Sequence, residues 1–392
     1  MKRMIAWILV LTLLLSGCAG KKTYVDDNVA NTAPDAAVEE TAAGENLQET
    51  AEETQEETTV PTEPPVLRNP LNGEILDEPF TGRIYANTVS NLKENMPHVG
   101  VNHADVIMEM YVNMNNVVRC LALFSDIESV DAIGSTRSTR PIFNDIAQHY
   151  DLVLTHAGGS STALQDARLR GIDNFNIDSW EVAKHGASYR DTQYKRSYEN
   201  SLFGVGPAIK AYAESMGVAM ELEKDYGFRF ADNGTPENGE AADKIALTMV
   251  YGQAKKDTSF VYHPELGKYV WNQYGMEMRD QITNELEGFT NVIVMFANIT
   301  NNGIYHAADF LAGGNGYYAC GGKLIPIVWA CDDEDSAFRF MTNEAEPLEM
   351  GVGNTYIAIL TPESPVTWEG IEAPAPVQET VAYGETAAPE NG

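Results

Sequence analysis

Three arginines, one histidine and one glycine-rich turn are the residues of this sequence best suited to binding an anion. A guanidinium can grip a carboxylate or a phosphate through two parallel hydrogen bonds. A glycine turn that leads into a helix presents backbone N–H groups at the positive end of the helix dipole. We therefore expect a pocket for an anionic ligand formed by Arg119, Arg137, Arg140, His156, Gly158, Gly159 and Ser160.

Glu109 is the candidate supporting residue for this pocket. It lies near the end of an otherwise apolar predicted strand, and Arg119 follows at the start of the next strand. The alternative interpretation is structural: Arg137 and Arg140 would form salt bridges with Glu109 and other carboxylates and would only hold loops together. The two interpretations make different predictions about where the side chains converge.

His156 and Ser160 also allow a hydrolase as the alternative function. His156 would act as a general base beside the Ser160 hydroxyl. The sequence Gly158-Gly159-Ser160-Ser161-Thr162 partly resembles a nucleophile elbow, but its last position is Thr rather than Gly. No acidic partner for the histidine can be identified, so we assign no catalytic residue. A buried histidine that bonds to loop backbone is the simpler interpretation of His156. For the protein as a whole, a protein-interaction surface is the third candidate function.

A first folded segment must position these residues. Buried strands are predicted at 83–89, 105–112, 117–124 and 152–155. The asparagine-rich turn between the second and third strands favours an antiparallel hairpin. Pro141 begins a predicted helix with an apolar face, and a second helix follows the glycine turn, with Thr162 and Gln165 spaced as a capping box and Gly171 at its end. A further helix is predicted over 207–216.

A second segment is mostly strand. Candidate strands lie at 245–251, 259–262, 269–274, 291–297, 317–320 and 324–330. Gly321-Gly322 predicts a two-residue hairpin turn, and Pro326 predicts an edge strand or a bulge because it lacks an N–H group. The fold class is therefore predicted as α+β, with a mixed α/β N-terminal domain and a mostly β C-terminal domain.

No metal site and no cofactor are predicted. His98, His103 and Asp105 match no known metal-ligand spacing. Three cysteines, Cys120, Cys320 and Cys331, are expected to be unpaired and mostly buried, because the hairpin turn would hold the last two roughly 25 Å apart at about 3.3 Å per residue. Trp271, Tyr274 and Trp329 suit either a carbohydrate-stacking platform or a packed core.

The N-terminus predicts a secreted, lipid-anchored protein. Lys2 and Arg3 precede an apolar run at 5–15 that is too short to span a membrane. The run ends in Leu15-Ser16-Gly17-Cys18, which resembles a bacterial lipobox. Removal of the signal peptide and acylation of Cys18 would anchor the protein to the outer side of the cell membrane.

The charge is strongly acidic and excludes general nucleic-acid binding. The 392 residues include 57 acids and 26 bases, a net charge of −31, which repels phosphate backbones. Residues 23–66 contain 12 acids and no Lys or Arg, and few large apolar side chains. We therefore predict six parts: signal peptide 1–17, acidic disordered tether 18–66, N-terminal α/β domain 67–222, linker 223–243, C-terminal β-rich domain 244–368, and disordered acidic tail 369–392.

An ordered series of motifs resembles the YerB-like family of bacterial lipoproteins, which has a two-part domain of unknown function. The series is Asn69-Pro70-Leu71-Asn72-Gly73, then 104–109, Arg119, 133–140 and His156-Ala157-Gly158-Gly159-Ser160, and the similarity extends to about Pro362. The resemblance implies the fold and an extracytoplasmic location but no activity. The family carries a histidine where this sequence has Glu199, so any chemistry of that histidine would be lost here.

The sequence thus predicts a membrane-anchored extracytoplasmic lipoprotein that acts as a binding or scaffolding module. Its expected partners are the membrane, through lipid such as palmitate on Cys18, and an anionic small molecule, peptide or wall-polymer fragment. A nucleic-acid partner is not expected. The convergence of the three arginines and His156 around the glycine turn decides whether the pocket exists.

Overall fold

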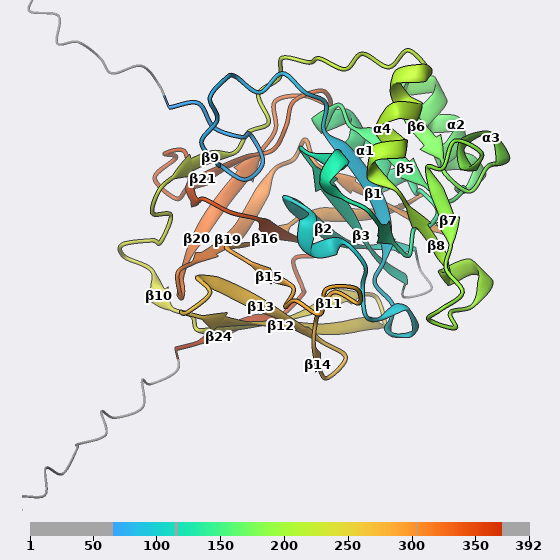
Figure 1. Cartoon of the computed structure of the whole chain (residues 1–392). Coiled ribbons are helices and arrows are strands. Elements are labelled where there is room, and N and C mark those ends of the chain that lie inside the picture. The colour runs from blue at the N-terminus through green and yellow to red at the C-terminus, as the bar shows by residue number, and fades with distance from the viewer. Residues whose placement is uncertain (1–65, 114–116, 303, 371–392) are drawn as a thin grey trace, which may run out of the picture. The chain divides into compact units, whose positions relative to one another are not determined.

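A large mixed β-sheet forms the centre of the folded chain (Figure 1). The computed structural model describes residues 66–113, 117–302 and 304–370. Along its main path the sheet has the order β10-β20-β19-β16-β23-β2-β3-β1-β5-β6, and β17, β18 and β21 are attached to it. The strands of this sheet are β1 (Tyr85–Ser90), β2 (Val106–Asn113), β3 (Val117–Phe124), β5 (Val153–His156), β6 (Asn174–Asn176), β10 (Glu240–Ala241), β16 (Asn291–Phe296), β17 (Asn298–Asn302), β18 (Tyr305–Asp309), β19 (Gly314–Cys320), β20 (Lys323–Ala330), β21 (Arg339–Thr342) and β23 (Thr355–Leu360).

A second sheet of six strands lies beneath the large one in Figure 1. Its strands are β11 (Lys244–Tyr251), β12 (Ala254–His263), β13 (Lys268–Gln273), β14 (Met276–Glu277), β15 (Gly288–Phe289) and β24 (Val366–Glu369). Two small sheets complete the strands: β4 (Ile133–Gly134), β7 (Ser188–Arg190) and β8 (Leu202–Gly204) in one, and β9 (Arg229–Ala231) with β22 (Glu349–Gly351) in the other.

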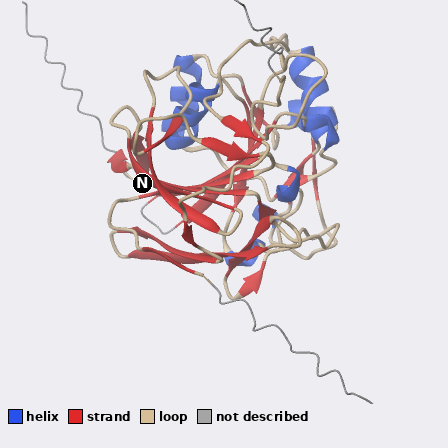
Figure 2. Cartoon of the chain, turned by 90° about the vertical axis from the view of Figure 1, so that its left-hand side faces the viewer, coloured by secondary structure: helices blue, strands red, loops and turns tan. Residues whose placement is uncertain are grey.

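The helices are few and short, and strands dominate the described chain (Figure 2). The α-helices are α1 (Pro141–Tyr150), α2 (Ser161–Arg170), α3 (Trp180–Ala183) and α4 (Gly206–Ser215), and the 3-10 helices are Lys93–Asn95, Val101–His103, Ile127–Ser129 and Tyr198–Asn200. Of the helices that the structure describes, none has both the length and the apolar character needed to cross a membrane.

Each face of the large sheet packs against a different layer. On one face, Ile142, Phe143 and Ile146 of α1 belong to a buried cluster with Met108 of β2 and Leu121 of β3. The opposite face packs against the smaller sheet, and this second cluster is rich in aromatic rings: Phe260, Trp271, Phe289 and Tyr356. The pattern of apolar residues in α1 is the one predicted, and Pro141 begins that helix as expected.

The predicted hairpins are confirmed. Strands β2 and β3 pair in antiparallel register, and Cys320 pairs with Lys323 across the turn between β19 and β20. Strand β20 is not an edge strand, since Pro326 pairs with Tyr317 of β19. On the other side of β20, Pro326 lies between the residues that pair with β10 and those that pair with β21, where it has no strand partner. Cys120, Cys320 and Cys331 are free and buried, as predicted.

The mixed and β-rich fold class is confirmed, but the structure does not show two separate domains. Strand β23, near the end of the described chain, lies between β2 and β16 and is parallel to both. The sheet therefore runs through both predicted segments. The predicted linker at 223–243 contains β9 and β10, and the described residues form one compact unit. The signal peptide, Cys18 and most of both predicted tails lie outside the described residues.

Candidate functional site

The candidate anion site lies at the carboxyl ends of the parallel strands β1 and β5. The segment that follows β4 continues the sheet here, because the Arg137 N–H donates to the Thr88 carbonyl at 2.8 Å and the Ala157 N–H donates to the Arg137 carbonyl at 2.9 Å. This segment thus inserts between the ends of the two strands and carries Arg137 and Arg140 there. The carboxyl ends of parallel strands are the usual place for ligands in open sheets.

The glycine turn brings the beginnings of two helices together. Gly158 has a φ of +67°, a left-handed conformation that glycine adopts without strain, and the Asn176 Oδ1 accepts a hydrogen bond from its N–H at 2.8 Å. The Thr139 N–H donates to the Gly158 carbonyl at 3.0 Å. Since α1 begins just after Thr139 and α2 just after Ser160, the positive ends of both helix dipoles lie at this edge of the sheet.

Ser160 is the N-cap of α2. Its hydroxyl oxygen accepts a hydrogen bond from the Ala163 N–H at 3.1 Å. The predicted capping box of Thr162 and Gln165 was wrong by two residues, because the Ser160 hydroxyl satisfies the first turn of the helix before Thr162 is reached. Gly171 ends the helix with a φ of +71°, as predicted.

Arg119 is a buried guanidinium with no carboxylate partner among the described residues. Its residue is 4% exposed, and its Nη1 donates to the carbonyl of Ser138. Burial lowers the pKa of Arg119 well below its ordinary value, and the nearby positive charges of Arg140 and Arg137 lower the pKa further. The three predicted arginines are therefore near enough to one another to interact electrostatically, and Arg119 is the most deeply buried of them.

Arg140 is also without an ion-pair partner in the described part of the chain. Its Nη1 donates to the carbonyl of Thr139 at 2.7 Å, and its guanidinium carbon lies 5.0 Å from the centre of the Tyr305 ring. Its Nε is buried and has no hydrogen-bond partner. Burial lowers the pKa of Arg140 as well. Two of the three guanidiniums are therefore held by carbonyls and an aromatic ring, which leaves their positive charge uncompensated.

Arg137 lines a small pocket of about 240 Å³ and is directed at Glu199. Its Nη1 donates to the Glu199 carbonyl and to the Asn200 Oδ1, both at 2.6 Å, and its Nη2 lies 3.4 Å from the Glu199 carboxylate. Arg190 and Tyr198 line the same pocket, with the guanidinium stacked 3.7 Å from the ring centre. The Glu199 side chain is 79% exposed, so this ion pair is at the surface.

His156 and Ser160 do not form a nucleophile–base pair. The His156 Nε2 lies 3.1 Å from the Asn174 Oδ1, and the Ser160 hydroxyl serves the helix cap. His156 is 1% exposed, and burial lowers its pKa, so the imidazole is neutral at pH 7. It therefore adds no positive charge to the arginines and resembles the buried structural histidine of the simpler interpretation. No observation on the described residues favours the hydrolase.

Glu109 does not support the arginines, which corrects the prediction. In the β2–β3 pair Glu109 lies opposite Cys120, while Arg119 lies opposite Met110, so the glutamate and the arginine project from opposite faces of the sheet. The Glu109 side chain is fully buried against the smaller sheet. There the Lys256 Nζ lies 2.7 Å from its Oε1, and Asn91 and Tyr356 also donate to the carboxylate.

Sequence reasoning missed this buried polar cluster, which joins the two sheets. Lys256 is 7% exposed and lies 5.9 Å from the centre of the Trp271 ring. Gln273 donates to the Asn91 Oδ1 at 2.8 Å, and Tyr274 donates to the Asn91 carbonyl at 2.7 Å. Alternation along β12 could have revealed Lys256. Side chains on one face of a strand recur at every second residue, and Lys256 lies on the same face as the buried Thr258 and Phe260.

The residues considered from the sequence as metal ligands or as a carbohydrate platform include several that are buried and stabilise the fold. The His98 Nδ1 lies 2.9 Å from the Glu287 carboxylate, and both side chains are buried. Within the described residues no group of three His, Cys, Asp or Glu side chains could hold a metal ion. Trp271 and Trp329 are buried, so they belong to the core rather than to a carbohydrate platform.

Comparison with known proteins defines the family once this geometry is known. Residues 71–219 match the family described as "Protein of unknown function (DUF3048) N-terminal domain", and residues 247–357 match its C-terminal domain. The chain belongs to this two-part family, and the two matches follow the two folded segments predicted from the sequence.

Two comparisons with YerB of Bacillus subtilis, one of sequence and one of structure, illustrate the similarity. The chain is 22% identical over 275 residues to "Putative lipoprotein YerB", an alignment that covers 69% of this chain and 80% of that relative. It is also similar to the crystal structure of the YerB protein, with a TM-score of 0.65, 19% identity, and coverage of 77% of this chain and 99% of the other. At this level of identity the second similarity establishes the fold.

Proposed function

We propose that this protein is a membrane-anchored extracytoplasmic lipoprotein that binds an anionic ligand at the Arg119–Arg137–Arg140 cluster. The lipobox ending at Cys18 and the lipoprotein name of the Bacillus subtilis relative support the anchor. The site would serve a binding or scaffolding module rather than an enzyme. The ligand class is a phosphate- or carboxylate-bearing small molecule, peptide or wall-polymer fragment.

One observation carries the proposal: Arg119 and Arg140 are charged, partly or fully buried, and without a carboxylate among the described residues. The chain has 57 acids and 26 bases, and most of its described arginines form an ion pair with a carboxylate, which Arg119 and Arg140 do not. A buried charge without a partner costs free energy, and a bound anion would remove that cost. The glycine turn and the two helix N-termini beside the arginines favour negative charge at the same place.

Replacing Arg137 tests the site. Inorganic phosphate and triglutamate, titrated into the purified protein at constant ionic strength, are the probes for the phosphate and carboxylate classes. We expect one of them to bind and Arg137→Ala to weaken that binding about tenfold or more, because a charge-assisted hydrogen bond contributes about 1.5–3 kcal/mol. Isothermal titration calorimetry gives the affinity.

The matched control is Arg229→Ala. Arg229 is an exposed arginine that forms an i,i+4 ion pair with Asp225 and lines neither the glycine turn nor the Arg137 pocket. Its replacement should leave anion affinity unchanged. Equal affinity of the wild type and Arg137→Ala for both probes, with unchanged melting temperatures, would contradict an anion site at this edge of the sheet.

Glu199 is expected to compete with the ligand for Arg137. Replacing it by Gln removes the negative charge that lies 3.4 Å from the Arg137 guanidinium and keeps the shape of the side chain. Because an exposed ion pair contributes only about 0.2–1 kcal/mol, Glu199→Gln should raise phosphate affinity by about two- to fivefold. Calorimetric titration of phosphate into the wild type and into Glu199→Gln measures the change in affinity. An affinity lower than that of the wild type would show that Glu199 helps the ligand to bind.

A further inference from the structure

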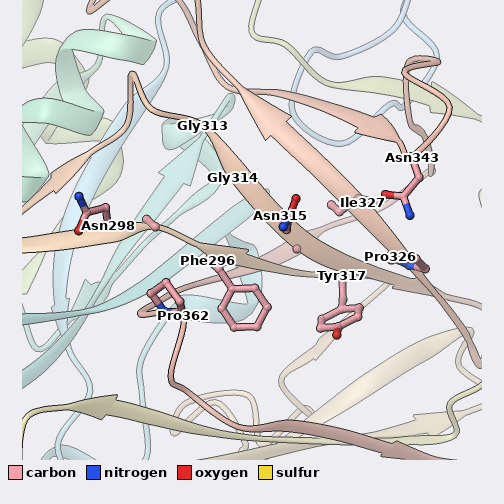
Figure 3. A pocket seen from close by; sticks show the side chains of 12 residues that line it. Phe296, Asn298, Gly313, Gly314, Asn315, Tyr317, Pro326, Ile327, Asn343 and Pro362 are labelled. Carbon is pink, nitrogen blue, oxygen red and sulfur yellow. The ribbon is translucent and has the colours of Figure 1, made fainter.

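A second surface hollow, separate from the arginine cluster, lies over the large sheet (Figure 3). Its volume is about 640 Å³, within the range of roughly 300–1,000 Å³ typical of ligand pockets. Strands β16, β19 and β20 contribute its floor, with Phe296 and Tyr317 beside each other and Pro326 at one end. We call this hollow the β19 pocket. No residue of the arginine cluster lines it.

The β19 pocket is uncharged, which is unusual in a chain with a net charge of −31. No Asp, Glu, Lys, Arg or His is among the residues that line it. A neighbouring hollow shares Pro326 and Asn343 with it and is lined by four carboxylates, those of Glu237, Glu344, Glu346 and Glu349. A negatively charged ligand would be repelled by these carboxylates, and a cation would find no counter-charge in the β19 pocket itself. The electrostatics therefore disfavour an anion, and the uncharged lining of the β19 pocket suits a neutral ligand.

Three carboxamides supply the polar groups of the β19 pocket. Asn298, Asn315 and Asn343 are all exposed, and Figure 3 shows the three spread along the hollow. Among the described residues none of these side chains hydrogen-bonds to another group. A carboxamide both donates and accepts, so it can satisfy a hydroxyl, which also does both. The pocket thus offers hydrogen-bond donors and acceptors side by side, which suits a ligand that carries several hydroxyl groups.

Two aromatic rings supply an apolar surface next to the carboxamides. The Phe296 and Tyr317 rings are half-buried and meet edge to face, with centroids 6.0 Å apart. Tyr317 also packs against Trp368 of β24, with centroids 5.1 Å apart, which limits its movement. A fixed aromatic ring beside hydrogen-bonding groups suits a molecule with an apolar face and a polar rim.

From these features together we propose that the β19 pocket binds a neutral saccharide. A pyranose ring has a face of C–H groups, which stacks on an aromatic ring, and a rim of hydroxyls, which the asparagines can satisfy. An extended uncharged peptide could also pair its backbone N–H and C=O groups with the asparagines, so the titration includes a peptide as the competing ligand. The stacking role thus falls to Phe296 and Tyr317 rather than to the buried tryptophans considered from the sequence.

Oligosaccharide titration tests this site. The purified protein would be titrated with maltotetraose, cellotetraose and the tetramer of N-acetylglucosamine, and binding would be followed by calorimetry and by the chemical shifts of backbone amides. We expect at least one tetrasaccharide to bind and to shift amides of β19. Tyr317→Ala should weaken binding about tenfold, because both the stacking contact and the buried apolar area of the ring are lost. Tyr317→Phe should keep most of the affinity.

Two further variants test whether a loss of saccharide binding in Tyr317→Ala could come from misfolding. Asn315→Ala changes an exposed side chain and should weaken binding several-fold without altering the melting temperature. Trp180→Ala removes a ring that is 78% exposed and lies outside the pocket, and it should have no effect. The proposal is overturned if none of the three tetrasaccharides binds, if Tyr317→Ala and Asn315→Ala bind as the wild type does, or if a proline-rich decapeptide binds in their place.

Discussion

Replacing Lys256 by Met is expected to lower the free energy of unfolding by about 3–5 kcal/mol. The change leaves the fully buried Glu109 carboxylate without its cationic partner, and an uncompensated charge in a dry interior is strongly destabilising. Chemical denaturation followed by tryptophan fluorescence measures the effect. The double variant Glu109→Gln with Lys256→Met removes both charges and should recover much of the lost stability, because the remaining partners are neutral.

Lys244→Met is the matched control for this experiment. Lys244 lies on the neighbouring strand β11 and forms an ion pair with Glu369 at 3.0 Å, but both side chains are largely exposed. Exposed pairs contribute about 0–1 kcal/mol, so this change should be nearly neutral. If Lys256→Met were equally mild, the Glu109–Lys256 pair would not be a fixed connection between the two sheets.

Replacing Arg119 by Met is expected to raise stability and to weaken anion binding. Burial lowers the pKa of Arg119, which means that its charged form is more costly in the folded chain than in the unfolded one. The group is charged at pH 7, so removing it should raise the free energy of unfolding by about 1 kcal/mol or more. Phosphate affinity should fall about fivefold or more, because one positive charge of the site is lost.

Arg83→Met provides the contrast. Arg83 is also buried, but it contacts the carboxylates of Asp151 and Asp173 at 3.2 and 3.1 Å. Its replacement should lower stability by about 1–3 kcal/mol and leave phosphate binding unchanged. An Arg119→Met protein that is as destabilised as Arg83→Met, with unaltered phosphate binding, would make Arg119 a structural residue. A residue whose removal stabilises the fold and impairs binding is typical of a functional site.

Local features of the fold could be predicted from the sequence because they depend on neighbouring residues. Strand β3 matches the predicted 117–124, Pro141 begins α1, and the Gly321-Gly322 turn sets the register of β19 and β20. These features follow from residue periodicity and from the backbone preferences of proline and glycine. The position of β23 between β2 and β16 could not be predicted, because it depends on pairing between strands more than 200 residues apart.

The candidate site shows the same limit. The proximity of Arg119, Arg137 and Arg140 was expected, since their predicted strand and loop positions lie near one turn. Two other findings were not expected. The neutral state of His156 depends on its burial, and the separation of Glu109 from the arginines depends on which face of the sheet its side chain occupies. A shift of one residue along a strand moves each side chain to the opposite face of the sheet. In a strand that is buried on both faces, the sequence has no polar–apolar alternation to show which residues lie on which face.

The place of β23 has a consequence for the order in which the sheet can form. Its six residues, Thr355–Leu360, fill the gap between β2 and β16, so the central sheet is discontinuous until this late part of the chain is present. A chain made from its N-terminus would leave the edge of β2 that pairs with β23 unpaired until residues 355–360 are present. Completion of the sheet at a late step fits this topology, and a chain that stops before Thr355 would keep this edge of β2 exposed to chaperones or to aggregation.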